Sequence, residues 1–508
     1  MRRLTGPGTF ALACVLVLGI AFVVQPEFDP DYWWHVLVGE QILHGTFPRT
    51  DPFTFTAVGH PFIVQEWGSE VLFAALMHLG VWAVVAVMAV VTAAGFGLAL
   101  DRARAHTSSN AVLAVLGVVG LAVGRTVFGP RPQMFTFLFV ALLLWLLDRY
   151  RRRGGREVWW LVPMFALWGN LHGGFSIGLG LFLVIIVGDW VSALLEIGTP
   201  VPRDRRRTLV AVFAASMAAL LINPNGIGVF SYAGGLITNA VAQSNLDEWR
   251  SPDFHNPEFI PLAVLIALLI VVAPRARRVD LTEALVAGAG LILALYAVRN
   301  LSTVAVTSMP LLADGLDEWA GILGAGRLRR RAADDAARSV ATALAMPFCA
   351  TVLAIVMVIA VGASAVAFAD PRNNDRSASY PVAVADALCK GPPANVFEPY
   401  GSAGWLLYEE NRGAPRPCAH DPVFIFGEVY VMGPQLFQEY LDASAAAPDT
   451  AAILESHDVT AVWQGRGSAL ASWLATNDRW TCVWGDPANV IYTPTSAAAD
   501  WPSSGTGC

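Results

Sequence analysis

Long apolar segments alternate with short arginine-rich segments along the first 370 residues. Six arginine clusters lie at 2–3, 102–104, 149–156, 203–207, 275–278 and 327–338. Between neighbouring clusters the chain is long enough for two helices of about 20 apolar residues. Arginine-rich loops of membrane proteins stay in the cytoplasm, so each interval is expected to hold an even number of spans. The first predicted span is an uncleaved N-terminal helix over 10–24, with its basic end in the cytoplasm. A last helix over 341–368 brings the total to about eleven transmembrane helices and places the C-terminus outside.

Residues 370–508 have a different pattern, in which short apolar strands alternate with helical stretches. Strands are predicted near 395–399, 459–464, 480–484 and 489–493, and helices near 381–389, 434–444, 450–457 and 467–476. The sequence therefore predicts a mainly α-helical, polytopic membrane domain over 1–369 and a soluble α/β domain over 370–508 outside the cytoplasm.

A polar segment over 26–69 forms the first external loop between the first two spans. Asp29 is a good N-cap for a helix that ends at Gly45, and residues 53–64 alternate as in a short hairpin. The next membrane helix is expected to start at Glu66. The loop also contains Trp33, Trp34 and Trp67. Tryptophan favours the boundary between membrane and water, so this loop is predicted to fold on a bilayer surface.

Composition agrees with the membrane assignment, because 55% of the 508 residues are hydrophobic and only 14% are charged. Lys390 is the only lysine. The preference for arginine, with the many Ala, Val and Gly residues, is typical of a bacterial genome of high GC content, so the expected location is a bacterial plasma membrane.

Four of the six cysteines follow residue 370, where an external domain permits disulfides: Cys389, Cys418, Cys482 and Cys508. They allow three full pairings, among which the sequence does not decide. A Cys389–Cys418 bond is the pairing that we favour.

The acids of the first loop are the main candidates for catalysis. Asp29 is accounted for as a helix cap, whereas Asp31 has no evident structural role. A carboxylate beside an apolar surface is suited to act as a general base or to bind a divalent cation such as Mg²⁺ or Mn²⁺. His35 follows Asp31 by one helical turn, so it is a candidate metal ligand with Asp29 and Asp31, a partner that orients the acid, or an ordinary interfacial histidine.

Other polar groups fall at the external ends of the predicted helices. Asn170 and His172 end an apolar segment beside glycines, which suggests either a lined cavity or a polar helix cap. Arg299 lies between two apolar runs, where its guanidinium needs an anion such as phosphate or must reach the lipid headgroups. Arg125 and Arg131 have the same interpretation.

The chain contains no phosphate-binding loop, dinucleotide fingerprint, Cys/His cluster or nucleophile elbow. Neither a nucleotide nor a nucleic acid is therefore an expected partner. An external reaction needs a substrate that is present outside the membrane, where nucleotides are scarce. A lipid-linked donor meets that need.

A series of motifs along the chain resembles a poorly characterised bacterial branch of the GT-C superfamily of membrane glycosyltransferases. The motifs are Asp31-x-Trp33-Trp34-His35, Gly45-x-x-Pro48-x-x-Asp51-Pro52-Phe53, Glu66-Trp67, Arg131-Pro132-Gln133, Trp168-x-Asn170-x-His172-Gly173, Asn223-Pro224-x-Gly226, Glu248-Trp249, Arg299-Asn300 and Tyr400-Gly401-x-x-Gly404-Trp405-Leu406. Glu66-Trp67 stands where some relatives have a lysine-containing motif.

The resemblance implies a polytopic enzyme that uses a sugar linked to polyprenyl phosphate. It implies that Asp31 or Asp29 is a catalytic base or metal ligand, with Glu66 as a further catalytic candidate. It also implies that external basic residues bind the lipid phosphate, for which Arg299, Arg131 and Arg125 are the candidates. The residues expected to line the cavity are Trp34, His35, Asn170, His172 and Asn300.

The expected reaction is an inverting transfer of the sugar to an external glycan, lipid or protein. Two alternatives belong to other classes. A lipid-linked-sugar transporter would place charges in the middle of its spans. A non-catalytic scaffold with an external binding domain would tolerate Asp31→Ala.

Overall fold

The computed structural model describes residues 29–197, 200–322, 380–411, 422–502 and 508. The predicted helices over 10–24 and 341–368 lie outside these residues. The chain divides into two compact units. The helical unit contains the described residues of 82–226 and 246–322. The α/β unit contains those of 29–81, 227–245 and 380–508. The first loop, which the sequence assigned to the membrane domain, thus shares a compact unit with the C-terminal domain.

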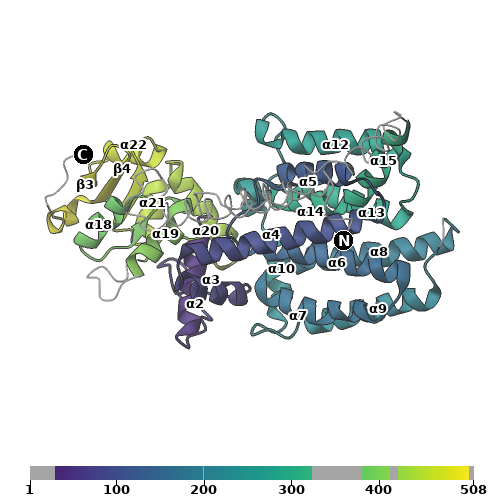
Figure 1. Ribbon diagram of the computed structural model, residues 1–508. Helices are drawn as coiled ribbons and strands as arrows, with labels where there is room; N and C mark the ends of the chain where they lie inside the picture. The colour runs from purple at the N-terminus through teal and green to yellow at the C-terminus, as the bar shows by residue number, and fades with distance from the viewer. Residues whose placement is uncertain (1–28, 198–199, 323–379, 412–421, 503–507) are drawn as a thin grey trace. The chain divides into compact units, whose positions relative to one another are not determined.

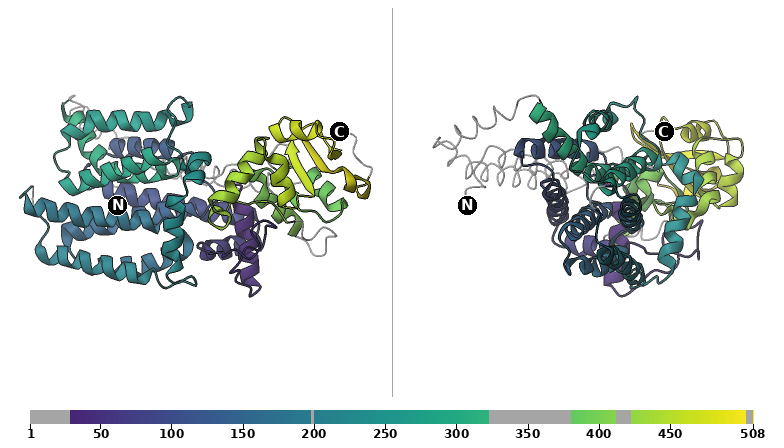
Figure 2. Two further views of the ribbon diagram at one scale, coloured as in Figure 1. Left: turned by 180° about the vertical axis from the view of Figure 1, so that it is seen from behind. Right: turned by 90° about the vertical axis from the view of Figure 1, so that its right-hand side faces the viewer.

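The helical unit consists of helices that pack side by side along most of their lengths (Figure 1), and several of them are seen end-on in the right-hand view of Figure 2. The helices are α4 (Val81–Ala103), α5 (Asn110–Gly124), α6 (Gln133–Arg153), α7 (Leu161–Leu171), α8 (Phe175–Leu194), α9 (Arg203–Ala219), α12 (Ile260–Val272), α13 (Leu281–Tyr296), α14 (Leu301–Thr307) and α15 (Met309–Ile322), with the short 3-10 helix η2 (Asp247–Trp249).

Four described helical segments are long and apolar enough to cross a membrane: Val81–Ala103, Gln133–Arg153, Phe175–Leu194 and Pro257–Arg275. Large apolar side chains on these and neighbouring helices face outward, including Val90, Ile270 and Ile292, which are 65%, 69% and 69% exposed. An apolar surface of this kind marks contact with lipid or with another protein. The structure is therefore compatible with a membrane protein, and the predicted count of about eleven spans is not confirmed.

A helix begins at Trp67, where the sequence predicted one, but this helix is too short to be the second span. Helix α3 (Trp67–Met77) has 11 residues and is about 16 Å long, whereas a bilayer core is about 30 Å thick. The backbone then breaks at Gly80, which has a φ of +108°. Because that conformation is costly for residues other than glycine, the chain ends one helix there and begins α4 at Val81. The apolar span is α4.

The α/β unit contains a four-stranded sheet in the order β1-β2-β4-β3 (Figure 1). Strand β1 (Val396–Phe397) pairs parallel with β2 (Ala461–Gly465), and β4 (Asn489–Pro494) pairs antiparallel with β2 and β3 (Trp480–Gly485). The C-terminal helices are α18 (Val382–Lys390), α19 (Tyr400–Asn411), α20 (Val429–Ser444), α21 (Thr450–Ser456) and α22 (Ala469–Ala475). All four predicted strands and all four predicted helices are present, and α19 was not predicted.

The first loop extends this sheet at its β1 edge. Isolated parallel bridges join Thr54 to Val423 and Val423 to Val396 of β1. Residues 49–51 also pair antiparallel with 60–62, where Asp51 donates its backbone N–H to the carbonyl of His60 at 3.0 Å. The predicted hairpin is thus present as a short pairing. Thr54 of the same loop pairs with Val423 beside the C-terminal sheet, which explains why the first loop and the C-terminal domain form one unit.

Helix α2 (Tyr32–Leu43) is buried inside the α/β unit along its first eight residues, up to Gly39. Trp33 and Trp34 are each only 4% exposed, so the prediction that they lie on a bilayer surface is wrong. Trp33 packs against Tyr408 with ring centroids 4.8 Å apart, and Trp34 against Phe426 at 5.4 Å. A tryptophan ring suits a buried core as well as an interface, and the aromatic residues of the C-terminal domain supply that core.

The end of α2 agrees with the sequence analysis, but its start differs. The N-cap is Asp31, not Asp29, and its side chain makes no capping bond. Asp29 Oδ1 accepts a hydrogen bond from the backbone N–H of Asp31 at 2.9 Å, in the turn just before the helix. Gly45 follows the helix with a φ of +89°. Beside this helix, a row of small residues allows close packing: a Cβ on Gly39 would meet the backbone of Glu70, and one on Gly404 of α19 would lie 2.8 Å from the carbonyl oxygen of Pro30.

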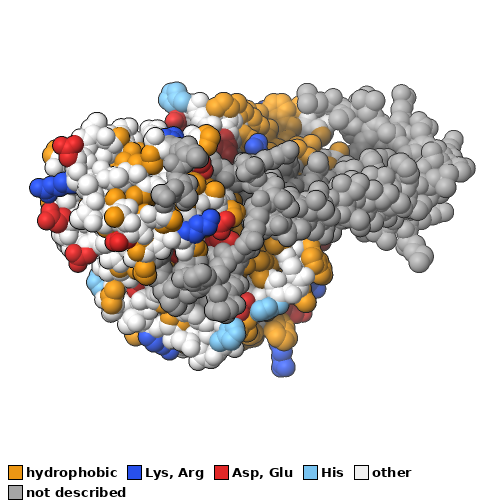
Figure 3. Space-filling view, turned by 90° about the vertical axis from the view of Figure 1, so that its left-hand side faces the viewer, with side chains coloured by type: hydrophobic (Ala, Val, Ile, Leu, Met, Phe, Trp, Pro, Cys, Tyr) orange, Lys and Arg blue, Asp and Glu red, His pale blue; other side chains and the backbone are white. Residues whose placement is uncertain are grey.

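The surface of the α/β unit differs from that of the helices. The face shown in Figure 3 carries acidic, basic and histidine side chains scattered among apolar and uncharged ones. A disulfide joins Cys482 of β3 to Cys508, whose Cα atoms are 5.8 Å apart. Cys389 is also disulfide-bonded. Cys418 lies outside the described residues, so the predicted Cys389–Cys418 bond stays a prediction.

Candidate functional site

A cluster of acids surrounds His35 in the α/β unit. His35 Nδ1 lies 3.1 Å from Glu70 Oε1, and His35 Nε2 lies 3.7 Å from Glu66 Oε2. Helices α2 and α3 bring these side chains together because Gly39 lets the two helices approach each other closely. His35 and Glu70 are buried, whereas Glu66 keeps 15% of its side chain exposed. The cluster thus has one edge that solvent or a substrate can reach.

Glu428 adds a third glutamate from the C-terminal domain. Its Oε2 accepts a hydrogen bond from the hydroxyl of Tyr232 at 3.1 Å, and its Oε1 accepts one from the backbone N–H of Tyr430 at 3.1 Å. Burial raises the pKa of Glu428 to about 7, although both hydrogen bonds oppose the shift. Glu428 also acts on Glu70, because its charge is one of those that raise the Glu70 pKa.

Burial sets the protonation of the central pair. It lowers the pKa of His35 to about 3, so the imidazole is neutral at neutral pH. Burial also raises the pKa of Glu70 well above its usual value, and the negative charges of Glu66 and Glu428 raise it further. A neutral His35 and a Glu70 with a raised pKa favour a hydrogen bond between them over a pair of opposite charges. Shifted pKa values of this kind gather at functional sites, which makes the cluster a candidate for proton transfer.

Asp31 lies next to this cluster at the start of α2. Its Oδ1 accepts a hydrogen bond from Trp34 Nε1 at 3.2 Å. The Trp34 ring lies against the His35 ring with centroids 3.7 Å apart. On its other side Asp31 contacts Gly427, where any Cβ would collide with Oδ1. Asp31 is thus a partly exposed carboxylate held between an indole and a glycine turn, and Glu428 follows that turn directly.

The predicted metal site does not take shape around these residues. Asp29 accepts the N–H of Asp31 and His35 points to Glu70 and Glu66, so the two side chains have different partners. Within the described ranges, no three or more His, Cys, Asp or Glu side chains are arranged to hold a metal ion. The set of Asp29, Asp31 and His35 therefore does not fit as metal ligands, and a divalent cation stays a prediction.

In the helical unit, three motifs that are far apart in sequence meet in one group. Arg131 and Arg299 each place a guanidinium nitrogen 3.4 Å from Glu248, on opposite carboxylate oxygens. Arg299 also lies over the ring of Trp249, 4.2 Å from its centroid, and its carbonyl accepts a hydrogen bond from Gln133 Nε2 at 2.5 Å. We call these five residues the external arginine group. Two arginines share one carboxylate, so the group keeps a net charge of about +1.

The sequence analysis gave Arg125 the same phosphate-binding role as Arg131 and Arg299, but in the structure Arg125 is not part of the external arginine group. Arg125 caps the C-terminus of α5 and is exposed. It makes no hydrogen bond or ion pair with the external arginine group in the part of the chain that the structure describes.

Three of the residues that were expected to line a cavity bond to groups outside the acidic cluster and the external arginine group: Asn170, His172 and Asn300. Asn170 Nδ2 donates to the carbonyls of Ala166 and Ile222, and Asn300 Nδ2 donates to that of Leu293. His172 Nδ1 lies 2.6 Å from the hydroxyl of Thr136 and accepts the backbone N–H of Gly174. The bonds to backbone groups are of the kind found at helix ends, as in the polar cap that the sequence analysis left open as one alternative for Asn170 and His172. The contact of His172 with Thr136 instead joins the end of α7 to α6. Of the five, only Trp34 and His35 border the acidic cluster.

Sequence reasoning missed Glu70, Glu428 and Tyr232. Glu70 is a charged residue in an otherwise apolar helix, one turn after Glu66, and this spacing was a usable signal. Glu428 follows the buried run of residues 423–426, which predicts a strand but no partner. Tyr232 lies in α10 (Gly228–Thr238), whose place in the α/β unit is decided by tertiary packing alone.

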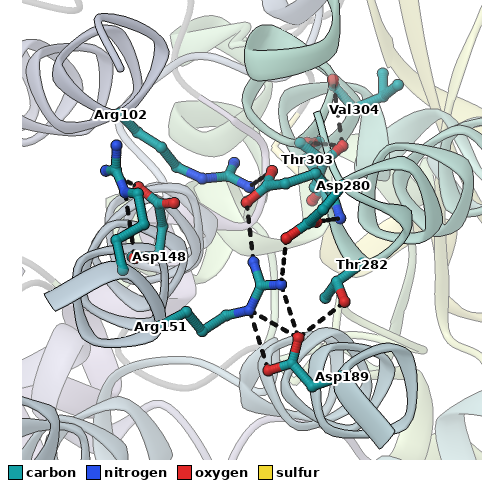
Figure 4. Close-up of polar contacts among 11 residues, drawn as sticks. Arg102, Asp148, Arg151, Asp189, Asp280, Thr282, Thr303 and Val304 are labelled. Carbon is teal, nitrogen blue, oxygen red and sulfur yellow. Dashed lines mark hydrogen bonds and ion pairs between the residues drawn. The ribbon is translucent and has the colours of Figure 1, made fainter. Parts of the chain in front are cut away.

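The predicted cytoplasmic arginine clusters also meet. Arg151 of α6 binds Asp189 of α8 at 2.7 Å and Asp280 at 2.6 Å, and Arg102 of α4 pairs with Glu283 of α13 (Figure 4). Arg205 donates to the carbonyl of Arg151, and Arg278 to that of His106. Four of the six clusters therefore share one end of the helical unit. Helix α6 separates it from the external arginine group, because Gln133 begins this 21-residue helix and Arg151 lies in its last turn.

No protein-family model matches this chain, and no curated protein matches it either.

Proposed function

We propose that this protein is a membrane glycosyltransferase of the GT-C type. It would transfer a sugar from a polyprenyl-phosphate donor to a glycan, lipid or protein outside the cytoplasm of a bacterial cell. The observation that carries the proposal is the meeting of Arg131, Gln133, Glu248, Trp249 and Arg299 in one positively charged group. These residues belong to three of the motifs that resemble the GT-C branch.

The chemistry of the external arginine group suits a lipid phosphate. Arg131 and Arg299 retain 23% and 20% of their side-chain exposure, so an anion can reach them. Two guanidinium groups can bind phosphate through paired hydrogen bonds, and a single half-exposed carboxylate does not neutralise both. In the transfer reaction the same charges would stabilise the phosphate as it leaves.

The carboxylates of the α/β unit would supply the base. Asp31 is the proposed base because it is the partly exposed acid of the first motif, and Trp34 and Gly427 hold it in place. Asp31 would accept the proton of the acceptor hydroxyl while the acceptor oxygen bonds to the anomeric carbon of the sugar. The bond from that carbon to the phosphate oxygen breaks, so polyprenyl phosphate leaves with inversion. A divalent cation, where one binds, would add positive charge at the phosphate.

The positions of the charges favour an enzyme over a transporter. In the four described segments that can cross a membrane, every charged residue lies within about two turns of a segment end, as Asp101, Asp148 and Asp189 illustrate. A transporter of lipid-linked sugars is expected to carry charges at mid-span. We place the arginine clusters in the cytoplasm, and the external arginine group and the α/β unit outside.

Lipid-linked glycans extracted from a deletion strain test the proposal. The strain is expected to accumulate a polyprenyl-phosphate sugar, and the wild-type gene should remove it. The Arg131→Gln/Arg299→Gln double variant should fail to do so, whereas Arg125→Gln, which removes an exposed arginine outside the group, should succeed. If the deletion causes no accumulation, or if the double variant restores transfer fully, the proposed donor or its phosphate site is wrong.

A further inference from the structure

A cavity of about 220 Å³ opens in the helical unit beside the last turns of α4 and α6. Four arginines line most of it, together with one acid and one aromatic ring: Arg104, Arg149, Arg152, Arg153, Asp101 and Trp145. We call it the arginine cavity. It lies near the C-terminal end of α6, and the external arginine group lies at the N-terminal end of the same helix.

The arginines of this region fall into two classes. Arg102 and Arg151 are buried and paired with acids of neighbouring helices (Figure 4). In the arginine cavity, only Arg152 has such a partner, Asp148 on its own helix. Arg104, Arg149 and Arg153 have no carboxylate partner among the residues that the structure describes. The one acid of the lining, Asp101, accepts a hydrogen bond from Trp145 Nε1 at 2.9 Å.

The cavity is therefore a hollow with unbalanced positive charge. Counting its four arginines and Asp101, the lining has a net charge of +3, and including Asp148 it is +2. Like charges gathered in one hollow repel each other, and an anion that binds among them removes that cost. Its volume is well above the roughly 30 Å³ of one water molecule in the liquid, so there is room for a polyatomic anion.

The surroundings indicate which anion fits. Guanidinium groups match the geometry of phosphate oxygens through paired hydrogen bonds. Trp145 adds an aromatic wall, over which Arg149 lies at 5.4 Å. The cavity is also at the ends of two of the helices that are long and apolar enough to cross a membrane, where headgroup phosphates of lipids are found.

We propose that the arginine cavity binds the headgroup phosphate of an anionic lipid at the cytoplasmic side of the membrane. The inference does not depend on the proposed transfer reaction, because it concerns other residues at the opposite end of α6. The chemistry that is recognised is a phosphate group, which soluble compounds can also supply, and the experiment separates the two sources.

Native mass spectrometry of the full-length protein in detergent measures this binding. The probes are dioleoyl phosphatidic acid and, separately, inorganic pyrophosphate. In the Arg149→Gln/Arg153→Gln variant, lipid affinity is expected to fall by about tenfold or more, since two charged hydrogen-bond donors to the phosphate are lost. Arg203→Gln/Arg207→Gln is the matched control, because it removes two charges from the exposed start of α9 and should change affinity by less than about twofold.

The possible results distinguish a lipid from a soluble phosphate as the ligand, and one of them would disprove the site. Binding of the lipid with this difference between variants supports the proposal. Binding of pyrophosphate alone with the same difference would overturn the lipid as the ligand and leave a site for soluble phosphates. Equal lipid binding by both double variants would mean a diffuse charge effect and would overturn the proposal. Arg104→Gln, at an exposed position after α4, gives the same test if the first variant does not fold.

Discussion

His35 Nδ1 and Glu70 Oε1 lie 3.1 Å apart, although the two residues are 35 positions apart in the chain, and both side chains are buried. This contact joins α2 to α3 at the centre of the α/β unit. Glu66 lies on the other nitrogen of the ring, and Glu428 contributes a further acid whose charge acts on Glu70. A histidine among three glutamates is expected to titrate with its neighbours, so proton binding is the property of this cluster that experiments can address first.

Replacing Glu70 tests its protonation. Because Glu70 is expected to be neutral, Glu70→Gln should keep a hydrogen bond to His35 and change the free energy of unfolding by less than about 1 kcal/mol. Glu70→Ala leaves a buried nitrogen of His35 without a partner, which costs about 1–3 kcal/mol. Thermal unfolding of both variants in detergent measures the difference. If glutamine destabilises as much as alanine, Glu70 is charged and pairs with a protonated His35.

Glu428 should make stability depend on pH. Burial raises its pKa to about 7, whereas an unfolded glutamate titrates near about 4.3. The folded state thus binds the proton more tightly, and the stabilisation present below about pH 4 is lost as pH rises to about 7, by up to about 3 kcal/mol.

The comparison of wild type with Glu428→Gln isolates that effect. His35 acts in the opposite direction, because its lowered pKa makes the protein less stable as pH falls below about 6.5. The difference in melting temperature between wild type and Glu428→Gln should therefore change steadily between pH 4.5 and 7 in favour of the variant. A difference that stays constant across this range would contradict a raised pKa for Glu428.

The two aspartates at the start of α2 should differ in function. Asp31→Asn should lower sugar transfer by about 10²–10⁴-fold, since it removes the proposed base. Asp29→Asn should remain active, because Asp29 accepts the N–H of Asp31 in the turn before α2 and the amide oxygen of asparagine can accept the same bond. Complementation of a deletion strain, with protein levels compared by immunoblot, measures both. Full activity of both variants would favour the scaffold, and loss only in Asp29→Asn would exchange the two roles.

Two glycines of α19 provide a matched pair for the packing of α19 on α2. A Cβ at Gly404 would lie 2.8 Å from the carbonyl oxygen of Pro30 and 3.1 Å from Trp34, whereas Gly401 has nothing within 4 Å. Gly404→Ala should therefore push α19 away from α2 and destabilise the protein by about 1–3 kcal/mol. Gly401→Ala should be neutral or stabilise it by up to about 1 kcal/mol. Equal melting temperatures for the two variants would show that this contact is loose.

Local pattern was enough to predict the four strands and helices α18, α20, α21 and α22 of the C-terminal domain, and the end of α2. Strands β1 to β4 follow from short apolar runs between turn residues, and the Gly45 stop follows from the backbone preference of a single residue. These signals are contained in a few neighbouring residues, so they can be read without knowledge of distant partners. Residues 223–226 form a turn, which suits the backbone preferences of Pro224 and Gly226.

The partners of those elements were decided by tertiary structure alone. The burial of Trp33 and Trp34 under Tyr408 and Phe426 could not be predicted, because an amphipathic ring fits a membrane interface and an aromatic core equally well. The acidic cluster forms only where residues 35, 70, 232 and 428 meet. No pattern within a short stretch of the sequence predicts that these residues come together. The spacing of apolar residues predicts which face of a helix or strand is apolar. It does not predict which other helix or strand packs against that face. That choice depends on complementary shape, as at Gly39 and Gly404, where the missing side chains let two helices approach.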